Sequence, residues 1–271
     1  MCPNCRAFIT TSDRTCPYCE VQVGEKAIDR RAPADLLGGL IPHAHFTTVL
    51  ILLINVGLYV AMALHGTGTG GSAGWTDFPG RTLFDFGAKF GPALREGEWW
   101  RLITAGFLHG GLLHIAMNSW VLFDLGARTE ENYGTARFLV FYIASTITGF
   151  YGSYLWSPGS LSVGSSAGIF GLIGAMIALG VRDGSAYGSE VRRMYTQWAI
   201  YGLVMGFLFS YTDNAAHVGG IVGGFAIAYV AGTPRLQRPT EKIWWGVAAV
   251  ALCATAGAFF IMLRHLMASN S

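Results

Sequence analysis

Long apolar segments decide what this chain can fold into. Most of them approach the ~20 residues that an α-helix needs to cross a bilayer. A membrane span must satisfy its backbone polar groups internally, which leaves helical bundles and closed barrels. The segments lack the alternation of barrel strands, so we expect an all-α polytopic membrane protein. The seven segments lie at about residues 44–63, 103–125, 137–156, 166–181, 195–211, 214–232 and 243–263.

The composition agrees with this expectation. Of 271 residues, 52% are hydrophobic and only 13% are charged, which is too apolar for one ordinary soluble domain. The formal net charge of +2 gives no reason to expect a nucleic acid as partner. The residues before the first apolar segment are polar and contain cysteine, so no cleavable signal peptide is expected.

Lysine and arginine indicate the orientation. When the seven segments are taken as spans, 13 of the 18 Lys and Arg residues fall on the side of the N-terminus and five on the other. Because cytoplasmic loops carry the excess of positive charge, the N-terminus is placed in the cytoplasm. We therefore expect a multi-pass protein of the plasma (inner) membrane, with the lipid bilayer as its surroundings.

Two C-x-x-C pairs mark a separate N-terminal unit. Cys2 and Cys5 form the first pair, and Cys16 and Cys19 form the second. Four thiolates at about 2.3 Å close the coordination sphere of Zn²⁺, so the predicted site is structural. Disulfides are the alternative, which a reducing cytoplasm disfavours. We predict a zinc-ribbon-like module at residues 1–22, for which we consider a cytoplasmic partner, and a cytoplasmic linker at 23–43.

Polar residues within the apolar segments are the candidates for function, because such groups are costly in a bilayer. His114 and Asn118 lie four residues apart and therefore on one helix face. Ser166 opens the fourth segment, and His217 opens the sixth. The second, fourth and sixth segments cross the membrane in the same direction. These four side chains are therefore expected at a common depth toward the outer leaflet, where they can converge.

Glycine makes a serine–histidine contact attainable. The imidazole must come within about 2.6–3.2 Å of the hydroxyl to deprotonate it, and small residues let two helices approach closely. The alternatives are generic membrane packing for the glycines and a hydroxyl bonded back to its own helix for the serine. The accompanying histidines and asparagine favour hydrolysis within the bilayer. The glycines concerned are Gly168, Gly171 and Gly174 in the fourth segment and Gly219, Gly220, Gly223 and Gly224 in the sixth.

Other chemistries receive less support. Residues 164–168 match the G-x-S-x-G pattern of soluble hydrolases, but that elbow needs a preceding strand in an α/β sheet. None of the seven histidines in the sequence begins an H-E-x-x-H motif, so a zinc protease site is not supported. A small-solute transporter would also use glycine-rich helices and intramembrane histidine. It predicts an inverted repeat, and the sequence has no convincing one.

Five motifs, in family order, resemble those of the rhomboid intramembrane serine proteases. They cover roughly residues 80 to 230 and are specific when taken together. The motifs are Gly97-Glu98-Trp99-Trp100-Arg101, the run from Phe107-Leu108-His109 to His114-Ile115-Ala116-Met117-Asn118, Glu130 with Gly134 and Arg137, Gly164-Ser165-Ser166-Ala167-Gly168-Ile169-Phe170-Gly171, and Asn214-Ala215-Ala216-His217-Val218-Gly219-Gly220.

The resemblance implies a serine endopeptidase that cleaves transmembrane segments of membrane proteins. Ser166 would be the nucleophile, and His217 the general base and then acid, without an acidic third member. His114 and Asn118 would donate to the oxyanion together with the backbone N–H of Ser166. Phe170 would pack on the imidazole. No cofactor is implied for catalysis, and the substrate is a transmembrane helix that unwinds and enters laterally.

The family resemblance also implies a six-span catalytic core at residues 44–232. Residues 233–271 then hold a seventh transmembrane helix and the C-terminal tail, an addition to that core like the zinc unit. Gly164 is expected as a supporting residue beside the serine. The alternative is a catalytically inactive rhomboid-like protein that binds membrane clients, against which the retained candidate site residues argue.

Overall fold

The computed structural model describes residues 5, 15–21, 46–68, 75–208, 212–232 and 241–269. The chain divides into two units, Met1–Pro42 and His43–Ser271. Cys2 and the predicted linker at 23–43 lie outside the described residues.

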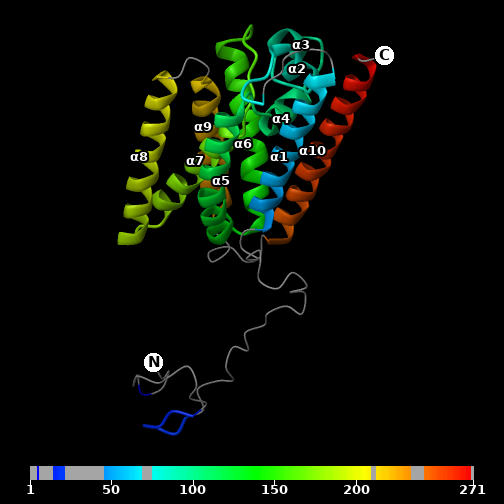
Figure 1. The fold of residues 1–271 in the computed structure, drawn as a ribbon. Coiled ribbons are helices and arrows are strands. Elements are labelled where there is room, and N and C mark those ends of the chain that lie inside the picture. The colour runs from blue at the N-terminus through cyan, green and yellow to red at the C-terminus, as the bar shows by residue number, and fades with distance from the viewer. Residues whose placement is uncertain are drawn as a thin grey trace. The chain divides into compact units, whose positions relative to one another are not determined.

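The described part of the second unit is a helical bundle (Figure 1). Shorter helices lie in the loop between the first two long ones: α2 (Gly80–Asp85), α3 (Gly91–Arg95), α4 (Arg101–Thr104) and the 3₁₀ helix η2 (Ala105–Phe107). An isolated antiparallel bridge joins Lys89 and Ser162. The expected all-α polytopic architecture is confirmed. Its long helices are α1 (Phe46–Gly68), α5 (Leu112–Tyr133), α6 (Thr135–Trp156), α7 (Ser166–Arg182), α8 (Ala186–Leu208), α9 (Asn214–Ala231) and α10 (Glu241–Ser269).

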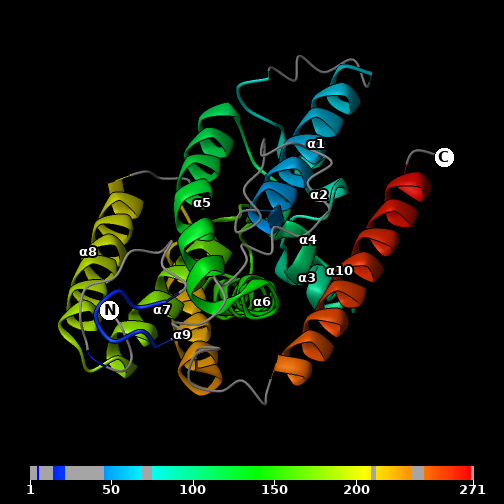
Figure 2. The same cartoon turned by 90° about the horizontal axis from the view of Figure 1, so that it is seen from below.

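Helices α6, α7 and α9 form the centre of the bundle, and Figure 2 views α6 nearly along its axis. The approach of α7 and α9 depends on glycine. A side chain at Gly220 would collide with the backbone of Ala167, and one at Gly224 with the backbone of Gly171. Helix α6 completes this centre, and its Tyr142 is fully buried there. Small residues on α9 thus bring its backbone against α7, as close helix packing in membranes requires.

The outer helices carry apolar surfaces suited to contact with lipid. Within the described residues, α1, α6, α9 and α10 are long and apolar enough to cross a membrane, and α7 is apolar but shorter. Helices α5 and α8 carry ion pairs near one end, between Asp124 and Arg128 and between Glu190 and Arg193. Both helices nevertheless expose large apolar side chains, because a bundle in a bilayer has no reason to hide them. The chain is a multi-pass membrane protein.

Two expected segment boundaries are wrong. The segment at 103–125 is not one span, since η2 ends at Phe107 and α5 begins only at Leu112. Ile103 and Phe107 are apolar because they are buried in the core of the bundle. The fifth long helix begins at Ala186 rather than near residue 195, because its first turns are charged and escape a search for apolar residues.

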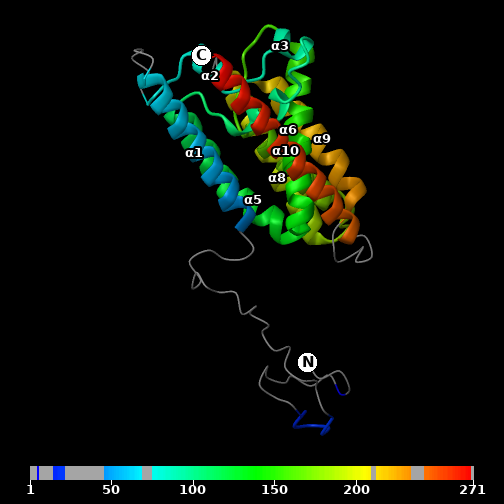
Figure 3. The same cartoon turned by 90° about the vertical axis from the view of Figure 1, so that its right-hand side faces the viewer.

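Helix α10 crosses the bundle beside α6 (Figure 3). At its N-terminal end, the buried Arg137 of α6 pairs with Glu241 and lies 5.2 Å from the ring centroid of Trp244. Near its other end, the ring of His265 lies 5.7 Å from that of Trp100 in the first loop. The added helix is therefore docked on the bundle at both of its ends.

Candidate active site

The predicted site residues lie in the first turns of three helices. His114 is in the first turn of α5, Ser166 opens α7, and His217 follows Asn214 at the start of α9. Asn118 lies one turn further along α5 than His114. All four residues therefore lie within the first two turns of their helices.

Gly164 brings His114 and Ser166 to a shared space. Its φ of +135° lies in the region that favours glycine, and its N–H donates to the carbonyl of Ala105 at 2.9 Å. A Cβ atom at this position would lie 2.8 Å from Nε2 of His114 and 3.5 Å from Oγ of Ser166. The missing side chain thus leaves the imidazole of His114 and the hydroxyl of Ser166 facing one small volume.

The proton on His114 can be assigned from its neighbour. The backbone N–H of Gly110 donates to Nδ1 of His114 at 3.4 Å. Because Nδ1 accepts this bond, the proton of the neutral ring belongs on Nε2. That nitrogen is the one beside Gly164 and Ser166. His114 therefore presents an N–H donor toward the serine.

His217 is held by a ring and by an amide. The ring of Phe170 stacks on its imidazole, with centroids 4.0 Å apart and planes inclined by 14°. Nδ1 of His217 lies 3.2 Å from Oδ1 of Asn214, so Nδ1–H donates and Nε2 keeps its lone pair. Ser166 and Phe170 are four residues apart on one face of α7. The stacked imidazole therefore lies over the face of α7 that carries Ser166.

Within the described residues, the side-chain hydrogen bond of His217 goes to Asn214, and none joins it to Ser166 Oγ. Catalytic hydrogen bonds are often long in a free enzyme and tighten when substrate binds. The arrangement of ring, amide and serine nonetheless supplies what a general base needs: a fixed plane, a fixed tautomer and a basic nitrogen.

Asn118 contributes a buried donor. Its side chain is only 8% exposed, and among the described residues its Nδ2 has no acceptor. An unsatisfied buried donor costs about 1–3 kcal/mol. A donor kept without a partner one helical turn from His114 is available to an oxygen that enters the site.

A histidine–serine contact is formed by the neighbours of the proposed site residues. His109 and Ser165 are both fully buried, and Nε2 of His109 lies 3.2 Å from Oγ of Ser165. The ring of His109 also meets that of His114 edge-on, with centroids 5.1 Å apart. The sequence favours a supporting or interfacial role for His109 over a catalytic one. Its contacts make it a positioning residue that steadies both the serine loop and His114.

Comparison with known proteins identifies the family. A family model described as the Rhomboid domain matches residues 96–234, just over half of the chain. The chain belongs to the rhomboid family. The rhomboid match runs from α4 through α9, so it includes every predicted active-site residue, and it leaves out α1, α10 and the first unit.

Three rhomboid relatives show how far the similarity extends. The chain is 32% identical over 218 residues to "Rhomboid protease GluP" of Bacillus subtilis (strain 168), across 80% of this chain and 40% of that protein. It is 34% identical over 180 residues to "Rhomboid-like protease 3" of Toxoplasma gondii, across 65% and 68%. It is 37% identical over 153 residues to "RHOMBOID-like protein 5" of Arabidopsis thaliana, across 55% and 49%. The chain thus spans about half the length of two of these relatives and about two thirds of the third.

In this rhomboid, the first loop is tied to the loop that leads to the serine. Lys89 is fully buried, and its Nζ donates to the carbonyls of Ser157 and Ser160 at 3.3 and 3.0 Å and to Oγ of Ser160 at 3.1 Å. Its backbone pairs with that of Ser162. Burial lowers the pKa of the Lys89 ammonium, and the negative charge of Asp213 opposes that shift. Lys89 therefore holds the segment at residues 157–162, which leads to Ser166, against the first loop.

Arg101 holds the first loop together from within. Its guanidinium pairs with Glu98 and donates to the carbonyls of Phe84 at 2.6 Å and Ala88 at 3.2 Å. Burial lowers its pKa, which the hydrogen bond and charge of Glu98 oppose. The arginine of the Trp99-Trp100-Arg101 motif is thus a structural residue of the loop.

The first unit contains a candidate metal centre. The Sγ atoms of Cys5, Cys16 and Cys19 lie within 4.8 Å of one another, with those of Cys5 and Cys16 3.6 Å apart. Four ligands at 2.3 Å around Zn²⁺ would place neighbouring sulfurs about 3.8 Å apart. The three thiols therefore fit a zinc ion.

Proposed function

We propose that this chain is an intramembrane serine endopeptidase that cleaves transmembrane segments of membrane proteins with Ser166 and His217. The observation that carries the proposal is the imidazole of His217, stacked on Phe170 and bonded to Asn214 over the face of α7 that bears the serine. The names of GluP and rhomboid-like protease 3 support it.

The reaction follows from the free lone pair on Nε2 of His217. That nitrogen takes the proton of Ser166 as Oγ attacks the scissile carbonyl carbon. The tetrahedral intermediate collapses, the C–N bond breaks, and the imidazolium protonates the departing amine. Water then attacks the acyl-serine, with His217 again as base, and releases the new carboxylate and Ser166. No cofactor enters these steps.

Charge that develops on the carbonyl oxygen needs donors. His114 Nε2–H, Asn118 Nδ2–H and the backbone N–H of Ser166 would supply them. Loss of one such donor typically lowers kcat by about 10²–10³-fold. The unsatisfied amide of Asn118 supports this assignment, because it keeps a donor ready without rearrangement.

The substrate follows from the place of the site. An intact transmembrane helix hides its peptide bonds in its own hydrogen-bond ladder, so the bond to be cut must lie where the helix unwinds. We assign the site to the outer leaflet of the plasma membrane with the N-terminus cytoplasmic, on the positive-charge asymmetry of the loops. Water for deacylation would reach the serine from that side.

Cleavage of transmembrane peptides by the protein reconstituted in vesicles tests this function. The wild type should cut peptides with small or helix-breaking residues, whereas Ser166→Ala and His217→Ala should not. An intact wild type that binds such peptides and leaves them whole would instead support the inactive, client-binding alternative.

For the N-terminal unit, we propose a structural zinc site at Cys2, Cys5, Cys16 and Cys19 in a module at residues 1–22. In the same scheme a linker spans 23–43, the catalytic core 44–232, and the seventh helix and tail 233–271. A cytoplasmic partner of the module belongs to this proposal. The purified protein should contain one zinc per chain, and Cys16→Ser should lose it. The matched variant Cys253→Ser in α10 should keep it, and equal zinc in all three proteins would contradict the assignment.

A further inference from the structure

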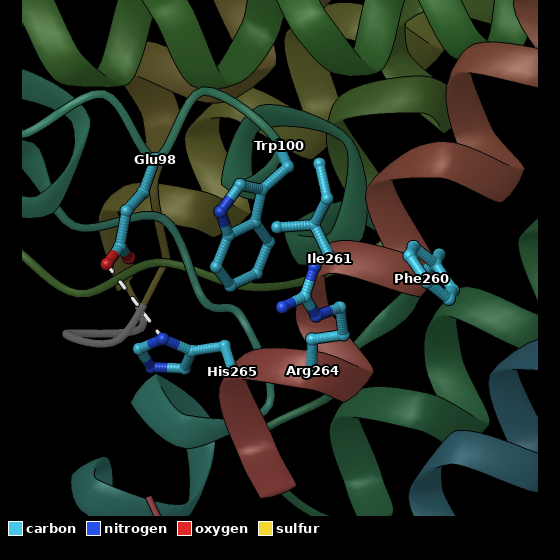
Figure 4. A pocket seen from close by; sticks show the side chains of 6 residues that line it. All are labelled: Glu98, Trp100, Phe260, Ile261, Arg264 and His265. Carbon is cyan, nitrogen blue, oxygen red and sulfur yellow. Dashed lines mark ion pairs between the residues drawn. The ribbon is translucent and has the colours of Figure 1, made fainter. Parts of the chain in front are cut away.

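A cavity of about 350 Å³ opens between the first loop and α10 (Figure 4). Helix α10 lies outside the rhomboid match, so the cavity combines a loop of the family core with an added helix. It is distinct from the proposed active site. The residues that line it are Glu98, Trp100, Phe260, Ile261, Arg264 and His265.

The cavity lies at the level of lipid headgroups. Helix α10 begins at Glu241, beside Trp244, and Arg264 is about 35 Å further along the axis at 1.5 Å per residue. The hydrocarbon core of a bilayer is about 30 Å thick. The exposed Trp99 lies at the Arg264 end, and the exposed Trp245 at the other, as expected of aromatic residues at the two interfaces. A guanidinium at Arg264 therefore emerges where lipid phosphates are.

The charges around the cavity leave a positive excess. Glu98 pairs with Arg101 and lies 4.0 Å from Nδ1 of His265. Asp85, the next acid in the loop, pairs with Arg81 at 2.9 Å. Within the described residues, no carboxylate pairs with Arg264. Figure 4 shows the side chain of Arg264 next to Ile261, apart from the Glu98–His265 pair. The cavity can thus accept one negative charge.

The remaining wall is apolar. Phe260 is 62% exposed and Ile261 is 36% exposed, and both belong to a helix whose outer surface faces lipid along its length. A ligand that places an anionic group on Arg264 can lay a hydrocarbon chain on these two side chains. Glycerophospholipids have this combination of a phosphate and acyl chains.

We propose that the cavity between the first loop and α10 binds an anionic glycerophospholipid, whose phosphate pairs with Arg264 and whose chain contacts Phe260 and Ile261. The same lipid would join α10 to the loop that holds Glu98 and Arg101. The added helix would then stabilise the first loop through a bound lipid as well as through His265. This inference is independent of the proposed proteolysis.

Binding of phosphatidylglycerol to the detergent-purified full chain, followed by native mass spectrometry, tests the proposal. Arg264→Gln should bind phosphatidylglycerol about fivefold more weakly than the wild type, since one arginine near the surface contributes about 1 kcal/mol toward an anionic lipid. Arg264→Lys should keep most of the affinity. The matched control is Arg95→Gln in α3, an exposed arginine outside the cavity lining, which should bind like the wild type.

Three results would overturn the proposal. Phosphatidylcholine with the same chains could bind as tightly as phosphatidylglycerol, which would remove the role of charge. Arg264→Gln and Arg95→Gln could bind equally well, which would place the lipid elsewhere. Soluble glycerophosphoglycerol or inorganic phosphate could displace the lipid at equal concentration, which would identify a free-phosphate site instead. None of these readouts depends on peptide cleavage.

Discussion

The ring of Phe170 lies flat on the imidazole of His217, with centroids 4.0 Å apart and planes inclined by 14°. Phe170 stands one turn beyond Ser166 on the same face of α7. The contact therefore joins the helix of the serine to the helix of the histidine. It fixes the plane of the proposed general base before any substrate arrives.

Replacing the ring of Phe170 should lower activity more than the accompanying loss of stability accounts for. Phe170→Leu keeps an apolar side chain but loses the stacking, for which aromatic pairs contribute about 0.5–1.5 kcal/mol. We expect kcat/KM for a transmembrane peptide to fall about two- to twelvefold. The matched control is Phe141→Leu, a fully buried aromatic of α6 that packs on Tyr133 and Trp244. Equal losses of activity in the two variants, at equal melting temperatures, would argue against a role in orienting His217.

Asn214 should matter through the tautomer of His217. Its Oδ1 accepts from Nδ1–H, while its Nδ2 donates to the carbonyl of Leu203 at 3.1 Å. Asn214→Ala removes a neutral hydrogen bond with a net value of about 0.5–1.5 kcal/mol. We expect kcat to fall about three- to tenfold with little change in KM. If the rate stays at the wild-type level, the imidazole does not need this partner.

Removal of the proposed oxyanion donor on α5 should affect the transition state more than binding. His114→Ala should lower kcat by about 10²–10³-fold and leave KM nearly unchanged. A variant that raises KM alone would show that His114 contacts the substrate in its ground state. The melting temperature of the variant in detergent serves as the control for folding.

Much of this site can be predicted from sequence, because the residues that bear the chemistry are costly in a bilayer and therefore conspicuous. His114, Asn118, Ser166 and His217 are polar groups within apolar segments. Because their three segments cross the membrane in the same direction, the four side chains are expected at a common depth. The stacking of Phe170 on His217 is also an expectation from the family resemblance that the contact in the structure matches.

Other parts could not be found in the same way. Ile103 and Phe107 are as apolar as residues of a membrane span, yet they are buried in α4 and η2 of the first loop. Hydropathy does not distinguish a protein core from lipid, so the sequence predicts a span there. The contact of His109 with Ser165 depends on how two loops meet. Asn214 carried a usable signal, because it stands three residues before His217 on the same helix.

Substitution of Lys89 tests whether the first loop needs this residue to support the active site. It is fully buried, and Lys89→Met would leave the carbonyls of Ser157 and Ser160 without its donor. A hydrogen bond to a charged group contributes about 1.5–3 kcal/mol, so the free energy of unfolding should fall by about that amount, and activity should fall with it. Lys242→Met at an exposed position of α10 should change stability by less than about 0.5 kcal/mol. A stable, fully active Lys89→Met protein would show that the first loop holds its place without this residue.

Covalent labelling of the serine decides whether Ser166 is a nucleophile activated by His217. The detergent-purified protein should react with a fluorophosphonate probe, with the adduct mapped to Ser166. Labelling should vanish in Ser166→Ala and His217→Ala, while Ser165→Ala should still be labelled at Ser166. A folded wild type that stays unlabelled, or an adduct that persists in Ser166→Ala, would contradict the account.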